Sequence, residues 1–359
     1  MNSGICSLAE RDGWHSVIGA FRDMDVYFFP EYHEIVRGQD EDAFLFWYRE
    51  GDRVAVLPFL RRPVACVPGL KEEPDFDGVT AYGYSGAIAN DPAVVPKSEF
   101  VSGFQAELTK RLTELGMVAL FSRQHPLLGC EALLAGLGEI EERGTTVVLR
   151  LEQSPEAQWG GISKGHRYDI RKAERMGVKV REGSAAEDLD TFIGIYNQTM
   201  TEIGARRVYF FPRCYYDELF QMLGRRVRLF LAEVDGVAVS AALFFFQSPI
   251  VQYHLSGTPR EQLKYLGAKV ILNEVRKLGA QEGYRWLHLG GGVGGAEDAL
   301  FRFKAGFSKE RLPFKTVKIV VDADRYDELV DLRRKAMGGD AGLLEKSAFF
   351  PVYRMACED

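Results

Sequence analysis

The sequence predicts an α/β protein made of two domains, and three observations support this prediction. The length of 359 residues is more typical of two domains than of one. Helix-like and strand-like segments alternate in the second half of the chain, and the first half repeats the pattern more weakly. Pro, Gly and Ser gather at 154–161, which favours a break between domains there. We therefore expect a first domain at 1–152 and a second at 153–321.

The second half has the clearest pattern. Apolar residues recur at helical spacing, and two apolar runs flank the pair Asp235-Gly236, which suits the positive φ angles of a tight hairpin turn. The expected elements are a helix at 187–204, a short helix at 215–223, strands at 227–234, 237–246 and 250–256, a helix at 263–278, a strand at 284–289, a helix at 297–307 and a strand at 314–321.

The first half repeats this order with a longer central loop. The expected elements are strands at 43–48, 53–60 and 79–88, a helix at 98–115, a strand at 117–123, a short helix at 127–137 and a strand at 145–151. An amphipathic helix is expected at 324–337. The apolar residues of 343–354 are expected to pack onto the protein.

Composition excludes several classes of protein. Hydrophobic residues make up 46% of the chain and charged residues 27%, which suits a soluble globular protein. The longest nearly apolar run, 237–246, is about half as long as a membrane-spanning helix. The five cysteines show no CxxC spacing, so we expect neither a disulfide framework nor a metal site. The start of the chain has no secretory pattern, and a cytoplasmic location is expected.

Charge is distributed unevenly along the chain. Residues 151–319 contain 25 Lys and Arg against 19 Asp and Glu, a net charge of +6, whereas the rest contains 20 against 32, a net charge of −12. The basic part suits an anion such as the phosphates of a nucleotide, a CoA or an RNA, although chance scatter of surface charge stays open. The net charge of −6 for the whole chain argues against tight duplex binding, and no DNA partner is expected.

The order of hairpin, third strand, helix and fourth strand is that of the acyltransferase fold typified by the GCN5-related N-acetyltransferases. In that fold the third and fourth strands part, and the loop before the helix binds phosphate on free N–H groups. This loop is 258–267 here, where Lys264, Gly267 and Lys269 match the acetyl-CoA pattern only in part. An ordinary start of a helix is an equally good interpretation of the loop. We predict two tandem acetyltransferase-like domains with mixed, splayed sheets.

Two segments make the sequence resemble a known family, the Fem-type peptidyltransferases. They are KGHRYDIRKAERMGV at 164–178 and HLGGGVGGAEDALFRFKAGF at 288–307; FFPEYHEIVRG at 28–38 and RVYFFPRCYYDEL at 207–219 are weaker likenesses. The resemblance implies transfer of an aminoacyl group from aminoacyl-tRNA to an amine of a peptidoglycan precursor, without a cofactor. It also implies that 322–359 joins the first domain.

Basic residues of the second domain are expected to bind the donor. Arg167, Arg171 and Arg175 follow at intervals of four, so they share one helix face, and guanidinium groups can fork onto phosphate oxygens. A solvated face with internal acidic partners is the alternative. The full set expected to bind the donor or its phosphate is Lys164, Arg167, Arg171, Arg175, Lys264, Gly267 and Arg302.

Lys304 is the leading catalytic candidate. It lies among phenylalanines, where burial of an ammonium is costly, and a fixed ammonium could stabilise the oxyanion of an acyl transfer. The alternative is that the amine reaches water past the aromatic rings. In the family this lysine is tied to catalysis. His125, which precedes a proline at a strand end where relatives often have an acid or His, is the candidate base.

Arg37 and Arg213 are the candidate phosphate ligands of the acceptor, because Arg37 aligns with a basic residue that has this role in the family and Arg213 stands in a similar relation. Tyr82 and Tyr84 could line the acceptor cleft in the first domain, although they suit packing equally well. The glycines at 290, 292 and 295 satisfy GxGxxG, but no βαβ unit follows them, so a dinucleotide site is disfavoured.

Two other functions stay open. One is an acyl-CoA-dependent N-acyltransferase that acts on a small amine or sugar, so the donor is a charged tRNA or a CoA. The other is a non-catalytic module that binds a nucleotide or RNA. The long helical hairpin that some Fem-type members carry has no room between Leu223 and Val227, which weakens the tRNA interpretation. The sequence leaves the oligomeric state open.

Overall fold

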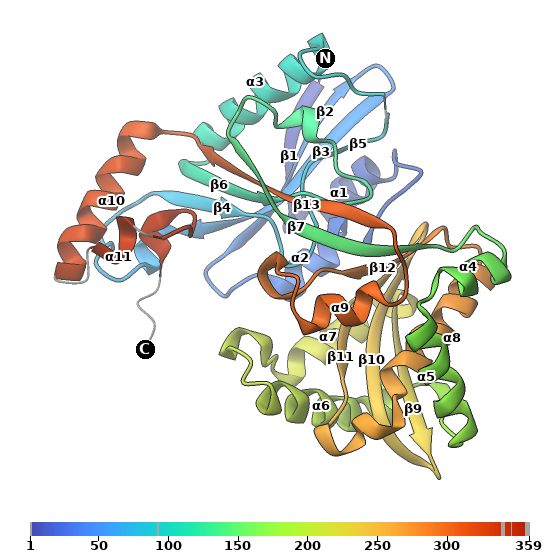
Figure 1. Ribbon diagram of the computed structural model, residues 1–359. Coiled ribbons are helices and arrows are strands. Elements are labelled where there is room, and N and C mark those ends of the chain that lie inside the picture. The colour runs from blue at the N-terminus through green and yellow to red at the C-terminus, as the bar shows by residue number, and fades with distance from the viewer. Residues whose placement is uncertain (1, 92, 339–341, 346, 356–359) are drawn as a thin grey trace. The chain divides into compact units, whose positions relative to one another are not determined.

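Figure 1 shows the computed structural model, which describes residues 2–91, 93–338, 342–345 and 347–355. Contacts between residues divide the chain into two units. Unit 1 consists of Met1–Arg22, Tyr27–Arg143 and Phe314–Asp359, and unit 2 consists of Asp23–Val26 and Gly144–Pro313.

Unit 1 is built on a mixed sheet. Its strands lie in the order β1 (Asn2–Ser7), β2 (Asp42–Glu50), β3 (Arg53–Pro63), β4 (Phe76–Val79), β6 (Met117–Arg123) and β13 (Arg311–Val320), and β5 (Ile88–Ala89) pairs with β3. The helices of the unit are α1 (Arg11–Ile18), α2 (Pro30–Val36), α3 (Glu99–Glu114), α10 (Ala323–Met337) and α11 (Gly342–Glu345). Strands β4 and β6 run parallel, and the chain between them contains α3.

Unit 2 repeats this plan. Its strands lie in the order β7 (Glu139–Arg150), β12 (Trp286–Gly290), β11 (Ile250–Gly257), β10 (Val237–Gln247), β9 (Val227–Val234) and β8 (Lys179–Gly183). The helices are α4 (Pro155–Gly161), α5 (Lys164–Arg175), α6 (Ala185–Glu202), α7 (Arg213–Leu223), α8 (Gly267–Gln281) and α9 (Ala299–Ala305). Strands β11 and β12 run parallel, and α8 connects them. The predicted α/β class with two acetyltransferase-like units is confirmed.

The sequence places the changes of domain at 152–153 and 321–322, a few residues beyond the divisions that contacts define. Strands β7 and β13 each continue without a break through a division. Gly144 and Pro313 stand at these two divisions, but a single Gly or Pro inside a strand does not end it, and the denser Pro, Gly and Ser of the next loop marks the boundary in the sequence instead.

The core of unit 2 explains its long apolar strand. Residues Val239 to Phe246 of β10 are all buried. Helices α5 and α8 cover one face of the sheet, and α6 and α7 cover the other (Figure 1). A strand that is buried on both faces has no polar alternation, which is why this run is continuously apolar. The hairpin turn before it has φ angles of 52° at Asp235 and 77° at Gly236, as the sequence predicts.

Strands β11 and β12 stay together only briefly. They pair at three positions, the last of which joins Gln252 to His288. Beyond it β11 continues along β10 to Gly257, whereas β12 pairs with β7 on its other side. The pairing of β11 with β10 also skips His254, so a bulge lies where the strands separate. The predicted splayed pair of strands is confirmed in unit 2.

The sequence is wrong about the third strand of the first half. It expects a strand at 79–88, but β4 ends at Val79 and the chain turns away. Gly83 has a φ of 103° within this turn, and a Cβ there would lie 2.3 Å from the ring of Tyr27. Aromatic residues between glycines therefore look like a strand although they line a tight loop.

The short helix expected at 127–137 is also absent from the described residues. That segment contains a single 3-10 turn, Glu131–Leu133, and Gly136 adopts a φ of 92°. The helices α1 and α2 and the strand β1 precede the first element that the sequence predicts. Their short length gives too few periods to detect.

Two helical glycines give a matched test of the packing of unit 2. A Cβ at Gly267 would lie 2.8 Å from the Cβ of Ser240 and 3.1 Å from that of Ala232, whereas a Cβ at Gly194 meets nothing within 4 Å. We expect Gly267→Ala to destabilise the protein by about 1–3 kcal/mol through overpacking. Gly194→Ala should stabilise it by up to about 1 kcal/mol. Urea unfolding of both variants checks this, and equal effects would contradict the packing of α8 on the sheet.

Candidate functional site

Lys304 lies in α9 and is 8% exposed, so its side chain runs into the protein and not out to water. Its Nζ donates a hydrogen bond of 2.7 Å to the carbonyl of Gly291, in the glycine-rich loop that follows β12. Among the described residues this is the one hydrogen-bond partner of an ammonium that has three N–H donors. The predicted alternative, in which the amine escapes past the aromatic rings, does not fit this burial.

One carboxylate acts on this ammonium from the same helix. Asp298 caps α9 by accepting from the N–H of Phe301 at 2.8 Å, and it also accepts from the N–H of Val293 at 3.0 Å. Burial lowers the pKa of Lys304 to about 8, and the charge of Asp298 opposes that shift. Burial also disfavours the charge of Asp298 itself, but these two N–H groups and Lys304 hold its pKa below the usual value. Lys304 therefore stays mostly charged at neutral pH while lying close to titration.

Helix α5 is fixed directly to the Lys304 segment. His166 donates from Nε2 to the carbonyl of Phe303 at 2.8 Å, and the N–H of Ser163 donates to the carbonyl of Gly306. A Cβ at Gly306 would lie 2.3 Å from the His166 ring, so only glycine allows this approach. The structure thus brings together the two segments that carry the family resemblance. The sequence missed His166, and its place inside the first of those segments was the available signal.

The basic face of α5 is only partly available to a ligand. Arg167 donates to the carbonyls of Trp159 and Gly160, and the guanidinium of Arg171 lies 5.4 Å from the centre of the Trp159 ring. These two residues hold α4 against α5. Lys164 and Arg175 are exposed at the two ends of the helix. Of the predicted donor-binding row, these last two are the residues best placed to meet an anion in solvent.

The start of α8 differs from a phosphate-binding turn. Gly267 opens the helix and packs on the sheet, and Lys264 is exposed beside the ring of Tyr265. Lys269 in the first turn binds Asp169 of α5, with Nζ 2.5 Å from Oδ2. The amine of Lys269 is therefore already paired and is not available to a phosphate at this N-terminal turn.

The other arginines predicted in this unit form local contacts. Arg302 is exposed on α9, and its Nη1 donates to the carbonyl of Glu297 at 3.0 Å. Arg213 binds Asp190 and Asp217 at the exposed start of α7. Its charge is already compensated, which makes it a poor fit for the predicted diphosphate site.

A buried polar network lies where β11 and β12 part. Gln252 Nε2 donates to Asp25 Oδ2 at 2.5 Å, and Gln252 Oε1 accepts from His288 Nδ1 at 2.7 Å. The N–H of Val26 also donates to Asp25, at 2.6 Å. Because Nδ1 carries the proton, the lone pair of His288 is on Nε2. No local pattern predicts this network, since Asp25 is more than two hundred residues from Gln252 in the chain.

The predicted residues of unit 1 gather at the end of β4 and β6. The rings of Tyr84 and His125 lie 6.1 Å apart, and Tyr84 also contacts Phe314 at 5.4 Å. The carbonyl of Tyr82 accepts from the hydroxyl of Tyr32 at 2.8 Å. Arg37 is exposed at the end of α2, and its Nη1 donates to the carbonyl of Glu41 at 3.2 Å.

His125 has a fixed proton arrangement. Its Nδ1 accepts from the N–H groups of Leu127 and Leu128, both at 3.1 Å. In a neutral ring the proton is therefore on Nε2, which can donate but has no lone pair to accept a proton. This geometry disfavours the base role that the sequence suggested, and it gives His125 the task of holding the turn after β6.

The described residues include no group of three or more His, Cys, Asp or Glu side chains placed to hold a metal ion. No helix among them is long and apolar enough to span a membrane.

The pKa of Lys304 has a consequence for stability. Between about pH 8 and pH 10.5 the unfolded chain keeps a proton on this lysine that the folded protein has released, so the free energy of unfolding rises with pH in that window. We expect the wild-type protein to gain about 2–3 kcal/mol relative to Lys304→Met across it. Denaturant unfolding at both ends of the window measures this. Parallel pH curves for the two proteins would show that the ammonium is not desolvated.

Comparisons with known proteins find Fem-type proteins both by sequence and by fold. Residues 131–236 match the model of the FemAB family. The crystal structure of FemX is similar with a TM-score of 0.69 at 13% identity, over 91% of this chain and 99% of that one. The C-terminal domain of a putative lysylphosphatidylglycerol synthetase from Agrobacterium fabrum gives 0.52 at 12% identity, over 87% and 92%. L-PGS from Bacillus licheniformis gives 0.52 at 11% identity, over 90% and 96%.

No curated protein is significantly similar to this sequence. The match at 131–236 starts before α4 and ends at the β9–β10 turn, so it includes the whole of helix α5, the first segment that carries the resemblance. The structural likeness extends over nearly the whole chain. The resemblance to Fem-type proteins with two acetyltransferase-like units is therefore confirmed, by the FemAB family model for 131–236 and by the fold for the rest.

Proposed function

We propose that the protein is a Fem-type N-acyltransferase, which moves an aminoacyl group from aminoacyl-tRNA to an amine of a peptidoglycan precursor. One observation carries the proposal: the buried ammonium of Lys304, bound to the Gly291 carbonyl beside the parted strands of unit 2. The match of 131–236 to the FemAB family and the likeness to FemX support the same class of reaction.

The chemistry follows from that ammonium. A neutral amine attacks the ester carbonyl of the donor, and negative charge develops on the carbonyl oxygen. Two N–H donors of Lys304 are not used by Gly291 and can bind this oxyanion, in a site where burial strengthens the interaction. Collapse of the intermediate breaks the ester bond. The ribose hydroxyl leaves with the proton that the amine loses, and an amide is formed.

The structure of α8 favours tRNA over CoA as donor. The acetyl-CoA pattern requires a small residue where this chain has Lys269, and the carboxylate of Asp169 lies against that turn at 2.5 Å from the Lys269 amine. The charge of Lys269 is already compensated by this carboxylate, so a pyrophosphate would have to displace the ion pair to bind there. Exposed cations at the ends of α5, Lys164 and Arg175, give a tRNA backbone separate points of contact.

The short connection between α7 and β9 bears on the choice of tRNA as donor. Helix α7 ends at Leu223 and β9 begins at Val227, so the helical hairpin of some Fem-type members is missing. The proposal therefore relies on α5, and not on such an insertion, to hold the donor. Unit 1 is proposed to recognise the acceptor through the residues around Tyr82 and Tyr84.

The role of Lys304 is testable by substitution. We expect Lys304→Met to lower the rate of transfer by about 100- to 1000-fold, the usual loss when one oxyanion donor is removed. Lys304→Arg should keep part of the activity, and Lys309→Met, at an exposed lysine, should keep all of it. Mass spectrometry of peptidoglycan precursors incubated with the protein and charged tRNA measures the product. Undiminished transfer by a folded Lys304→Met protein would remove the catalytic assignment.

The donor is testable independently. Calorimetric titration with CoA should show no binding at concentrations where charged tRNA binds, because the Lys269–Asp169 pair occupies the turn at the start of α8 and leaves Lys269 without a free charge for phosphate. Replacing both members of the pair, Asp169→Asn with Lys269→Gly, removes that obstacle and serves as the control. CoA binding to the wild-type protein, together with transfer from acetyl-CoA, would instead establish the N-acyltransferase alternative. Binding of tRNA without any transfer would leave a non-catalytic module.

A further inference from the structure

Arg123, the last residue of β6, is firmly anchored where β4 and β6 end. Its N–H donates to the hydroxyl of Thr80 at 2.9 Å, and its Nη1 donates to the carbonyl of Thr80 at 2.8 Å. The guanidinium also lies 5.0 Å from the centre of the Phe121 ring. The last two contacts fix the direction of the side chain before any ligand arrives.

The charge of Arg123 has no compensation from the residues around it. No carboxylate in the described part of the chain pairs with it, and its Nε and Nη2 donate to no acceptor there. Burial lowers the pKa of Arg123 to about 10, and the charge of Arg62 adds to that shift. A half-buried cation without a counter-ion is unfavourable in the empty protein.

The neighbouring charges increase the positive excess. Asp77 is fully buried and is bound by two guanidiniums, those of Arg62 at 2.6 Å and of Arg354. The charge of Asp77 is therefore taken up by these two guanidiniums, and Arg62 is close enough to Arg123 to lower its pKa. A cation with a like charge nearby and no carboxylate of its own attracts an anion.

Tyrosines form a fixed wall beside this charge. The hydroxyl groups of Tyr32 and Tyr82 are close enough to Arg123 to affect its pKa. Tyr32 is held by its bond to the Tyr82 carbonyl and by the Tyr27 ring at 5.2 Å. Tyr82 is 46% exposed, so this side of the cluster opens to solvent. On the other side of Arg123, the Phe121 ring contacts Phe350 at 6.3 Å.

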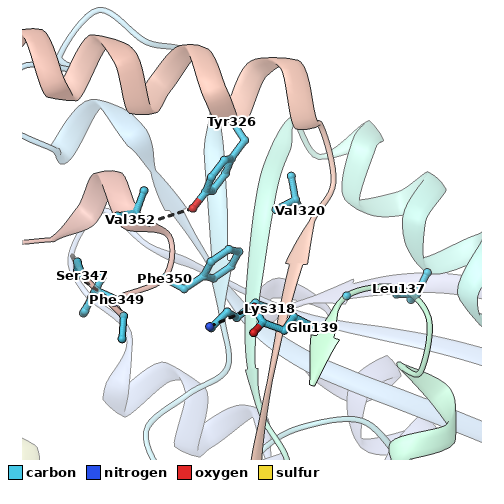
Figure 2. Close-up of a pocket in the computed structure, with 11 residues that line it drawn as sticks. Leu137, Glu139, Lys318, Val320, Tyr326, Ser347, Phe349, Phe350 and Val352 are labelled. Carbon is cyan, nitrogen blue, oxygen red and sulfur yellow. Dashed lines mark hydrogen bonds and ion pairs between the residues drawn. The ribbon is translucent and has the colours of Figure 1, made fainter. Parts of the chain in front are cut away.

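A groove lined by both polar and apolar residues includes Phe350. Figure 2 shows this groove, which has a volume of about 420 Å³ and includes Tyr326, Phe349 and Phe350 in its lining. Its one cation, Lys318, is bound to Glu139 and Glu141, so the groove itself offers no free positive charge among the described residues. An anion is therefore drawn to Arg123, and the groove suits only an uncharged part of a ligand.

We propose that Arg123 binds an oxyanion, a carboxylate or a phosphate, of the acceptor that unit 1 recognises. A guanidinium whose Nε and Nη2 both still have N–H groups to donate matches two oxygens of one such group in a fork. A cationic group would be repelled, and a neutral amide would not offset the charge. That the bound group belongs to the acceptor rests on the proposed function. The anion site itself does not depend on it.

Chemical protection of the unmodified full-length protein tests the site. Phenylglyoxal reacts with accessible arginines, and peptide mapping by mass spectrometry gives the rate at Arg123. We expect N-acetylglycine or inorganic phosphate, at about ten times its dissociation constant, to slow that rate about tenfold, because only the unoccupied site reacts. N-acetylglycinamide, the neutral counterpart, should have no effect. Whichever anion protects better identifies the chemical source of the oxyanion.

Variants connect the site to the reaction. Arg123→Gln should raise the KM for the acceptor about tenfold or more with little change in kcat, and Arg123→Lys should recover part of the loss. Arg61→Gln is the matched control, because Arg61 also lies over an aromatic ring, Phe76 at 4.0 Å, and donates to a carbonyl, but is paired with Asp42.

Each result has a defined meaning. Equal protection by the neutral amide, or no protection by either anion, overturns the site. An unchanged KM in a folded Arg123→Gln protein overturns its role towards the acceptor. If the anions protect Arg123 but no transfer occurs with any donor, the proposed function fails and the anion site stands.

Discussion

The separation of β11 and β12 is the constraint on which the rest of unit 2 depends. The strands share three paired positions and then lead to different neighbours, so the chain after β12 is free to form the glycine-rich loop. That loop offers the Gly291 carbonyl to Lys304. The buried network of Asp25, Gln252 and His288 lies at the last shared position. Since buried polar groups need their partners, it fixes where the strands stop pairing.

Both units have the same arrangement of strands around a cation, with a different side chain in each. In each, a helix connects two parallel strands, and a poorly solvated cation lies where those strands end. Unit 2 has Lys304, whose pKa burial lowers to about 8, and unit 1 has Arg123, whose pKa burial lowers to about 10. The lysine can give up its proton near neutral pH and the arginine cannot. This difference suits a lysine that stabilises transient charge and an arginine that binds a permanent anion.

The sequence predicts much of the fold because its signals are local. The hairpin at Asp235-Gly236 and the helix 324–337 appear in the structure within a residue or two of their predicted bounds. The prediction of a strand at 79–88 is wrong because aromatic residues between glycines resemble the alternating pattern of a strand. The phenylalanines around Lys304 in the sequence single it out as a catalytic candidate, and its burial agrees with that hypothesis. Arg123 and Asp25 did not stand out, because the feature that singles out each one is a relation to residues distant in sequence.

The most direct test of the account is the protonation of Lys304 itself. Protein labelled with ¹³C at the lysine ε-carbon gives one resonance for each lysine, and Lys304→Arg identifies the one that belongs to this residue. The account predicts that this resonance titrates near pH 8, shifted by burial from the ordinary 10.5. A resonance that titrates near 10.5 would mean that the ammonium is solvated, and the oxyanion role would then have no physical basis.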